Sequence, residues 1–281
     1  MRREIPIVTL TSDWGTRDYY VGAVKGNLLR HIPGVNIVDI SHDIDPYDII
    51  QTAFVLRNSY KYYPKGTIHI IGVDTDASLE NPHAMVYADG HYFIGADTGV
   101  FSLILDKKPE KIIYLDIIQK TPYLTFPSRD LFCLAAKIIA DGDPLENLGD
   151  EAESINQLQD ISPVIDKNII RAKVIYIDRY QNLITNLSKE VFEKVGQERE
   201  YVIHFHKKEY DMDKISDSYN DSDINEADLM AIFGSAGLLE IALCRGKASE
   251  LLGMTIDSSI IIKFVEEEEN DIENSFYPKK I

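Results

Sequence analysis

The sequence has little of what marks a secreted, membrane-bound or metal-binding protein. It contains only two cysteines, Cys133 and Cys244, which lie far apart in apolar surroundings and without the spacing of metal ligands. We therefore expect two reduced thiols. No apolar run reaches the roughly 18–20 residues that span a bilayer, and the N-terminus leads into a short strand rather than the apolar core of a signal peptide. These absences predict a soluble, cytoplasmic protein with no membrane partner.

Positive charge is scarce as well. Lysine and arginine total 29 residues against 46 aspartates and glutamates, which gives a formal net charge of −17. Binding to a nucleic-acid backbone requires clustered basic side chains, so we expect no nucleic-acid partner. Part of the acidic excess lies between Asp211 and Asp228 and in residues 266–281, which include Glu266–Glu269. The first segment predicts solvated loops, and 266–281 predicts an acidic flexible tail.

The patterns that are present predict two domains in the 281 residues. Up to residue 150, apolar strands such as Ile5–Leu10 and Thr67–Val73 alternate with amphipathic helices. This alternation favours a mostly parallel sheet flanked by helices. One helix is expected to run from Asp45-Pro46 to about Asn58, with Asp45 as its N-cap.

The character of the sequence changes beyond residue 150. The polar segment 151–166 is expected to be a linker, and residues 167–265 hold short strands separated by turns. This pattern predicts a smaller β-rich domain of the sandwich or barrel type. The expected fold class of the whole chain is therefore α/β, with a β-rich domain towards the C-terminus.

The common catalytic motifs are absent too. The sequence holds no glycine-rich phosphate loop, no nucleophile elbow and no histidine–cysteine cluster at metal spacing. Several polar residues nevertheless stand at the ends of apolar strands: Asp13, Asp74, Asp76 and Asp97 in the first domain, and residues 178–182 and 234–237 in the second. Ligands of open α/β sheets bind at the carboxyl ends of strands. We expect a ligand site there, suited to ribose hydroxyls, an amine or a metal.

The segment Thr9–Gly26, which contains Thr11-Ser12-Asp13-Trp14-Gly15, resembles the start of the S-adenosylmethionine (SAM) hydroxide adenosyltransferases, the family that includes the fluorinase and chlorinase enzymes. Further similar segments follow in the family's order, at residues 39–49, 63–74, 97–102, 125–130, 178–186 and 234–242. The resemblance covers most of residues 5–260. It implies SAM or adenosine as the small-molecule ligand, no cofactor and no metal, and a homotrimer whose sites lie between subunits.

The resemblance also assigns roles to substrate-binding residues. Asp13 would hold the ribose hydroxyls, since an ionised aspartate only accepts hydrogen bonds. Asp178 would meet the amino group of the methionine part, and Ser235 its amino-acid end. Asn182 would donate to and accept from adenine, while Tyr180 would pack on a flat face. The alternative for Asp178 and Asn182 is a polar turn between two strands.

The implied reaction is displacement at C5′ of SAM by water, which releases adenosine and methionine. The sulfonium leaves readily, so the enzyme has to position a partly desolvated water. In the family's hydrolase branch an Asp–Arg–His set does this, and Asp74 matches its first member. The family pattern would place the arginine near position 81, where this chain has Asn81, and Pro127 replaces the histidine. His83, on the loop after Asp74, can orient a water instead, or be an exposed loop histidine.

Other features keep further interpretations open. Ser128 stands where the fluorinase branch has a halide-contacting serine, although a serine before Arg129-Asp130 also suits a helix N-cap. Ala236 stands where fluorinase has an arginine for the carboxylate. We predict a SAM hydrolase. The alternatives are a catalytically silent SAM or adenosine binder, a SAM-dependent halogenase, and a nucleotide hydrolase that uses the aspartates with a divalent metal.

Overall fold

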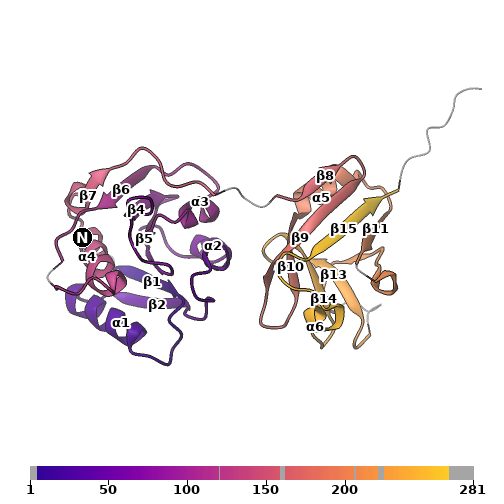
Figure 1. Cartoon of the computed structure of the whole chain (residues 1–281), viewed down its shortest axis with the longest axis horizontal. Coiled ribbons are helices and arrows are strands. Elements are labelled where there is room, and N and C mark those ends of the chain that lie inside the picture. The colour runs from indigo at the N-terminus through magenta and orange to yellow at the C-terminus, as the bar shows by residue number, and fades with distance from the viewer. Residues whose placement is uncertain (1–4, 120, 159–161, 206, 221–224, 266–281) are drawn as a thin grey trace, which may run out of the picture. The chain divides into compact units, whose positions relative to one another are not determined.

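The computed structural model describes residues 5–119, 121–158, 162–205, 207–220 and 225–265. The chain forms two compact units, which we call the first unit (Met1–Asp160) and the second unit (Ile161–Ile281) (Figure 1). The predicted tail, residues 266–281, lies outside the described residues. None of the described helices is long and apolar enough to span a bilayer. Both cysteines are free thiols, as predicted.

The first unit is built on a seven-stranded sheet with the order β2-β1-β3-β5-β4-β6-β7. Its strands are β1 (Ile7–Ser12), β2 (Asn36–Ser41), β3 (Ile68–Gly72), β4 (His83–Ala88), β5 (His91–Ala96), β6 (Lys111–Leu115) and β7 (Gly149–Glu151). Five strands run in one direction, and β4 and β7 run in the other. Every residue of β3 is buried, as expected of an apolar strand covered on both faces.

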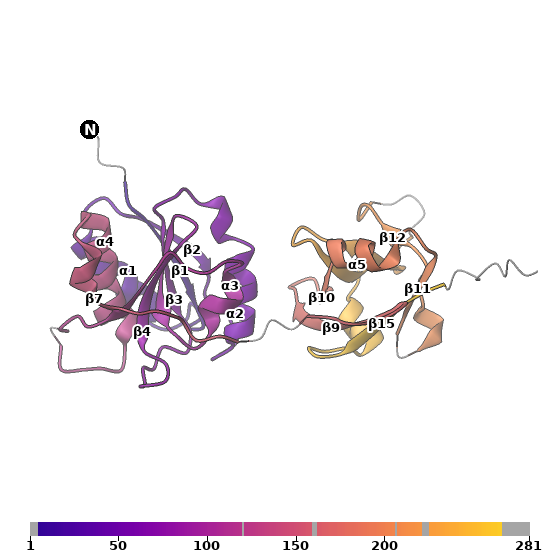
Figure 2. The same cartoon turned by 90° about the horizontal axis from the view of Figure 1, so that it is seen from above.

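Helices cover both faces of this sheet (Figure 2). One face carries α1 (Tyr20–His31) and α4 (Cys133–Asp141), and the other carries α2 (Ile49–Arg57) and α3 (Val100–Ile104). The first unit also contains three short helical turns: η1 (Tyr60–Tyr62), η2 (Ser128–Phe132) and η3 (Leu145–Leu148). Side chains alternate along β1, so Val8 and Leu10 join the α1 and α4 core. The predicted α/β class is confirmed.

Helix α2 begins later than the sequence predicts. Its N-cap is Asp48, whose side chain accepts a hydrogen bond from Gln51 N at 2.8 Å. Asp45 was the wrong N-cap because a turn comes first, in which Asp48 N donates to Asp45 O. Within that turn Tyr47 adopts a left-handed conformation, with φ +66°, which a helix does not tolerate.

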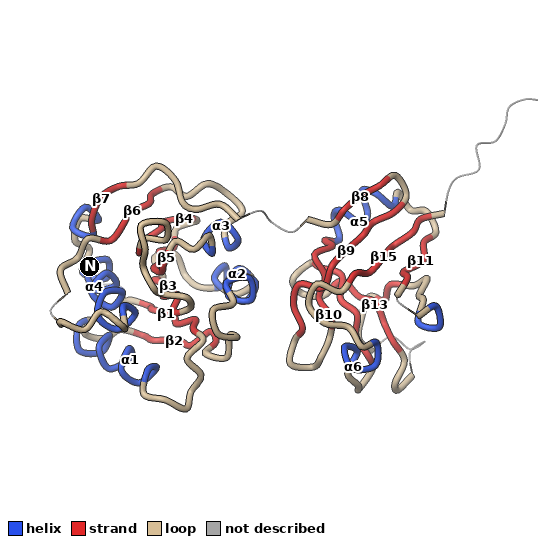
Figure 3. Tube along the Cα trace, in the orientation of Figure 1, coloured by secondary structure: helices blue, strands red, loops and turns tan. Residues whose placement is uncertain are grey.

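The second unit is one curled sheet of eight strands (Figure 3). Its strands are β8 (Val164–Asp166), β9 (Ile169–Ile177), β10 (Leu183–Ser188), β11 (Tyr201–His204), β12 (Ile215–Ser216), β13 (Leu229–Phe233), β14 (Leu238–Leu243) and β15 (Ser259–Phe264). Its helices are α5 (Lys189–Gly196), α6 (Ala248–Leu252) and the short η4 (Lys208–Tyr210). Phe192 of α5 packs on Phe233 and Phe264, which closes the apolar core. The prediction of a β-rich C-terminal part is confirmed, and its sheet curls into a half-barrel.

Candidate functional site

The strand order of the first unit creates a ligand-binding position at the carboxyl ends of β1 and β3. From β1 the chain crosses to β2 on one side and then to β3 on the other, so the connections diverge between β1 and β3. Such a divergence leaves a crevice at the carboxyl edge of an open sheet. Ser12 pairs with Gly72 at this edge. Asp13 and Asp74 follow the two strands directly, so the topology brings these two predicted residues together.

Asp13 is held by the turn that precedes α2. Its Oδ2 accepts a hydrogen bond from the backbone N–H of Tyr47 at 3.0 Å. The left-handed conformation of Tyr47 belongs to this turn. No described residue donates to Oδ1 of Asp13, which therefore can accept a hydrogen bond from a ligand. The sequence did not single out Tyr47, because its contribution is a backbone N–H that no residue type reveals.

Asp74 combines a strained backbone with a carboxyl group of raised proton affinity. Its φ is +46°, a left-handed value that is uncommon for a residue other than glycine and that clusters at functional sites. Partial burial raises the pKa of its carboxyl group, and the neighbouring charges of Asp76 and Asp13 raise it further. No described residue donates a hydrogen bond to this carboxylate. Asp74 is therefore suited to accept a proton or a hydrogen bond from a small polar ligand.

His83 is the first residue of β4 and does not lie in a loop, contrary to the sequence interpretation. It pairs with Ala96 of β5, and its ring packs edge-on against Phe132 with a centroid distance of 5.1 Å. Nε2 lies 2.8 Å from Thr75 O. Burial lowers the pKa of His83, although the Thr75 carbonyl and Asp76 act in the opposite sense. The neutral ring thus donates from Nε2 to the loop after Asp74 and keeps Nδ1 as an acceptor.

The loop between Asp74 and His83 is fastened from a distant part of the chain. Asn156 Nδ2 donates to Glu80 O at 2.7 Å and lies 3.3 Å from Asn81 Oδ1. The backbone N–H of Asn156 donates to Oδ2 of Asp97 at 2.9 Å. Asp97 is fully buried, and burial raises the pKa of its carboxyl group. Sequence analysis missed Asn156, since nothing local marks a residue that binds a loop about 75 positions away.

Aromatic side chains and Ser128 form the wall beside this edge. The Trp14 ring covers Gly72 so closely that a Cβ there would lie 2.3 Å from its Cζ2 atom, and it meets Phe126 edge-on at 5.4 Å. Ser128 starts a π-helical turn and makes no N-cap hydrogen bond, so the N-cap alternative is wrong. Its hydroxyl is fully buried and has no partner among the described residues. A buried free hydroxyl is a hydrogen-bond donor available to a ligand.

The four predicted residues of the second unit separate into a turn and two exposed side chains. Asp178 accepts from Asn182 N at 2.8 Å and from Asn182 Nδ2 at 3.0 Å, in the turn between β9 and β10. These bonds are those of the polar-turn alternative. Tyr180 is 77% exposed, and Ser235 is also exposed. Both can contact a ligand without any change in the core.

A buried carboxylate that sequence analysis missed lies beside this turn. Glu240 on β14 is buried and accepts a hydrogen bond from the Tyr219 hydroxyl at 2.5 Å. Burial and the negative charge of Asp178 raise the pKa of Glu240, whereas the hydrogen bonds with Tyr219 and Asn182 lower it. Glu240 thereby joins Asp178 and Asn182 in one polar cluster. Strand periodicity gave it no functional signal.

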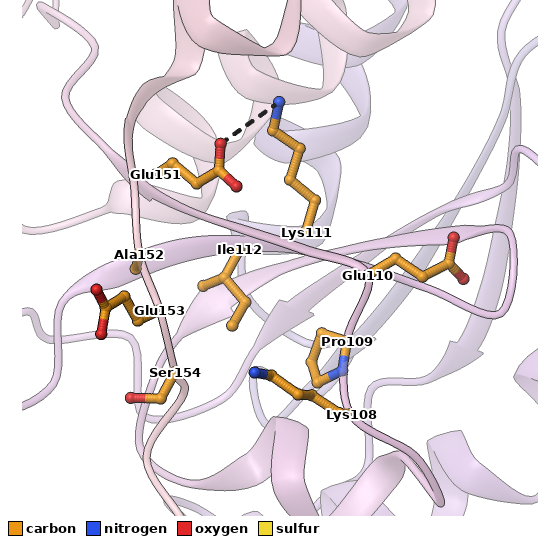
Figure 4. Close-up of a pocket in the computed structure, with 9 residues that line it drawn as sticks. All are labelled: Lys108, Pro109, Glu110, Lys111, Ile112, Glu151, Ala152, Glu153 and Ser154. Atoms are coloured by element: carbon orange, nitrogen blue, oxygen red, sulfur yellow. Dashed lines mark ion pairs between the residues drawn. The ribbon is translucent and has the colours of Figure 1, made fainter.

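A groove in the first unit lies at the other edge of its sheet (Figure 4). This groove of about 620 Å³ runs between residues 108–112 and 151–154. Lys111 pairs with Tyr87 at the hairpin end of β4, opposite to Asp97, and its Nζ lies 3.9 Å from Glu151. The groove is thus separate from Asp13, Asp74 and Asp97. Among the described residues, no three His, Cys, Asp or Glu side chains are arranged to hold a metal ion.

Comparisons with known proteins point to one family. The model described as the SAM hydroxide adenosyltransferase N-terminal domain matches residues 8–149, and the model of its C-terminal domain matches residues 172–261. An (R)-S-adenosyl-L-methionine hydrolase of Methanocaldococcus jannaschii is 33% identical, covering 68% of this chain and 70% of the relative. The enzyme of the same name from Thermus thermophilus is 31% identical, covering 88% and 95%.

More distant similarities agree with these matches. A fluorinase of an Actinoplanes species is 24% identical, covering 68% of this chain and 74% of that enzyme. The crystal structure of an uncharacterized conserved protein from Thermotoga maritima is similar, with a TM-score of 0.81 and 26% identity. That similarity covers 92% of this chain and 99% of the Thermotoga protein.

Proposed function

This chain belongs to the SAM hydroxide adenosyltransferase family, and we propose that it hydrolyses SAM to adenosine and methionine. One observation carries the proposal: Asp13 and Asp74 stand together where β1 and β3 end, and the carboxylate of Asp74 has no described donor. The first can bind a ribose and the second can bind the attacking water. Relatives at 31% and 33% identity bear the name of this hydrolase.

Substrate binding divides between the two units. Asp13 accepts hydrogen bonds from the ribose hydroxyls through the oxygen that Tyr47 N–H leaves free. In the second unit, Asp178 attracts the ammonium group of the methionine part, Ser235 binds its amino-acid end, and Asn182 and Tyr180 contact adenine. No cofactor takes part. The sulfonium supplies its own leaving group.

The chemical step is an in-line displacement at C5′. The water oxygen forms a bond to C5′ while the C5′–S bond breaks, and its electron pair goes to sulfur. The water proton passes to Asp74, whose raised pKa favours this transfer. Nδ1 of His83 is free to accept a second hydrogen bond from the water, because Nε2 is bound to Thr75 O. Asp74 and His83 together take the place of the family's Asp–Arg–His set. The arginine and the histidine of that set are missing here, where Asn81 and Pro127 stand instead.

A homotrimer completes the site in this proposal. Asp13 and Asp74 of one subunit then face Asp178 and Asn182 of another, as the family resemblance implies. Large apolar side chains at the relevant loops support a covered surface: Tyr47 is 73% exposed and Leu79 is fully exposed. We also propose a cytoplasmic location, which the two free thiols favour.

The direct test is product analysis. Purified protein incubated with SAM should yield equal amounts of adenosine and methionine by chromatography. Asp74→Asn should lower the rate by about 100-fold or more, because it removes the proton acceptor. The matched control Asp116→Asn changes an exposed carboxylate just after β6 and should leave the rate within about twofold. Binding of SAM or adenosine without turnover would make the protein a silent binder instead.

A halogenase is the second candidate, because the buried Ser128 hydroxyl has no partner among the described residues. A free O–H group can donate to a halide ion. In that case SAM and chloride should give 5′-chloro-5′-deoxyadenosine, and Ser128→Ala should abolish the product. Adenosine as the only nucleoside at every chloride concentration would reject this candidate.

A further inference from the structure

We propose that His42 is a positioning residue that holds Asp13 in the orientation required for ribose binding. The inference rests on the proposed function, since it assigns to His42 a role in the same substrate site. It follows from a continuous set of contacts that join β1, β2 and α1 around the residues on either side of Asp13.

The contacts of the His42 ring form a chain of four side chains. Ser12 Oγ lies 2.6 Å from His42 Nδ1. His42 Nε2 lies 3.1 Å from Asp39 Oδ1. Lys25 Nζ completes the chain at 2.5 Å from Asp39 Oδ2. The chain starts at the residue immediately before Asp13 and ends on α1.

The charge of Asp39 sets the direction of these bonds. Partial burial acts to raise the pKa of Asp39, but the contacts with Lys25 and His42 together hold it below its usual value. Asp39 is therefore ionised and favours the N–H of His42 on Nε2. Nδ1 is then an acceptor, and the Ser12 hydroxyl donates to it. The ring is therefore held by a hydrogen bond at Nδ1, while Nε2 faces the Asp39 carboxylate at 3.1 Å without the geometry of a hydrogen bond.

The same histidine also binds the backbone on the far side of Asp13. Gly15 N donates to His42 O at 2.8 Å, and the Trp14 ring stacks on the His42 ring with an interplanar angle of 18° and a centroid distance of 6.2 Å. Ser12, Trp14 and Gly15 thus all attach to His42. Asp13, between them, can rotate little, and Tyr47 N–H meets its Oδ2.

Burial limits what these side chains can do. Ser12 is fully buried, and His42 is 6% exposed. Neither reaches a ligand in solution, so the Ser12–His42–Asp39 arrangement is not a nucleophilic triad in spite of its residue types. Its effect on a substrate passes through Asp13. Loss of the arrangement should weaken ribose binding before it alters the chemistry.

Two substitutions test the contacts of the two ring nitrogens independently. His42→Asn places a polar atom near the position of Nδ1 and can keep the Ser12 bond, whereas His42→Gln extends towards Asp39 and cannot. Adenosine binding by calorimetry should then be within about threefold of the unaltered protein for His42→Asn and about tenfold weaker for His42→Gln. Ser12→Ala should weaken binding by a similar factor, and it provides the test if the histidine variants do not fold.

A third substitution separates positioning from stability. His91→Asn changes another buried imidazole of the first unit. His91 is the first residue of β5, at the opposite end of the strands from Asp13. It should lower the unfolding temperature without altering the dissociation constant for adenosine. In an Asp13→Asn background, His42→Gln should add less than about a twofold loss, because the two residues act through one contact.

The outcomes distinguish this inference from the proposed function. The inference is overturned if His42→Gln and Ser12→Ala bind adenosine as tightly as the unaltered protein while that protein still hydrolyses SAM. It is also overturned if His42→Asn loses as much affinity as His42→Gln. Failure of the unaltered protein to bind either adenosine or SAM overturns the proposed function, and the role of His42 with it.

Discussion

At the scale of single residues, three neighbouring carboxylates distinguish the candidate site. Partial burial raises the pKa of Asp74, and the charges of the neighbouring Asp76 and Asp13 raise it further. The arginine that the hydrolase branch supplies is missing, and Asn81 is bound by Asn156 instead. Without a nearby described cation, Asp74 keeps a high proton affinity, which favours its role as an acceptor for the attacking water.

This electrostatic arrangement predicts the pH dependence of the reaction. Asp74 must be ionised to accept the proton, so kcat/KM should fall as the pH drops through its raised pKa. Asp76→Asn removes one of the charges that raise this pKa. The acid limb of the profile for Asp76→Asn should therefore lie at lower pH than that of the unaltered protein. An acid limb that does not move would show that Asp74 is not the group that titrates.

At the scale of elements, close packing at the ends of β1 and β3 defines the shape of the site. Trp14, from the loop after β1, covers Gly72 at the end of β3. A side chain at position 72 would occupy the volume of the indole. The site wall therefore depends on one glycine in the neighbouring strand.

Gly72→Ala should displace Trp14 and lower the free energy of unfolding by about 1–3 kcal/mol. It should also weaken adenosine binding, because Trp14 adjoins Asp13. Gly22→Ala is the matched control: a Cβ at this position in α1 meets nothing within 4 Å, and the substitution should raise stability by about 0.5–1 kcal/mol. Equal effects of the two substitutions on adenosine binding would contradict the role of Trp14.

A second element-level feature joins three neighbouring strands. Thr9 on β1 lies 2.7 Å from Nδ1 of His69 on β3, and Nε2 of His69 lies 3.2 Å from Nδ1 of His91 on β5. Burial lowers the pKa of His69 from 6.5 to about 3, and the charge of His91 adds to the effect. The ring is thus neutral in the folded protein.

Acid should therefore destabilise the first unit through His69. Below pH 6.5 the unfolded chain binds a proton at this residue that the folded chain excludes until about pH 3. The stability contribution is complete above pH 6.5 and falls by about 1.4 kcal/mol per pH unit below it. Denaturant unfolding at several pH values should show a shallower slope for His69→Phe. The same slope in both proteins would contradict the lowered pKa.

The sequence predicts elements better than it predicts contacts between them. Apolar runs located β1 and β3, and the strand ends indicated Asp13 and Asp74, because period and polarity are local properties. Asp45 was predicted as the N-cap because it precedes Pro46, but the left-handed turn at Tyr47 moves the cap to Asp48, and no local pattern reveals that turn. The contacts of Asn156 and His42 depend on chain segments that meet only in the fold.

At the scale of the whole molecule, the proposed site needs residues from both units. Each unit has its own sheet and core, and the residues that we propose for ribose binding and for adenine binding are divided between them. A cyclic trimer would satisfy this division if neighbouring subunits exchange their halves of the site. The acidic surface, with a net charge of −17, favours solubility of such an assembly.

Subunit mixing tests this division. Asp74→Asn alters the first-unit half of a site, and Asp178→Ala alters the second-unit half. After random exchange of subunits, sites that combine two unaltered halves should restore about a quarter of the full activity in a shared-site trimer. No recovery, in spite of exchange verified by mass spectrometry, would place both halves of each site in the same subunit.

Hydrolysis of SAM in H₂¹⁸O tests the central claim most directly. Attack of water on C5′ should place one ¹⁸O atom in the 5′-hydroxyl of the adenosine product, which mass spectrometry detects as a heavier adenosine. Methionine should carry no label. Unlabelled adenosine, or a halogenated nucleoside in its place, would contradict water as the nucleophile at this site.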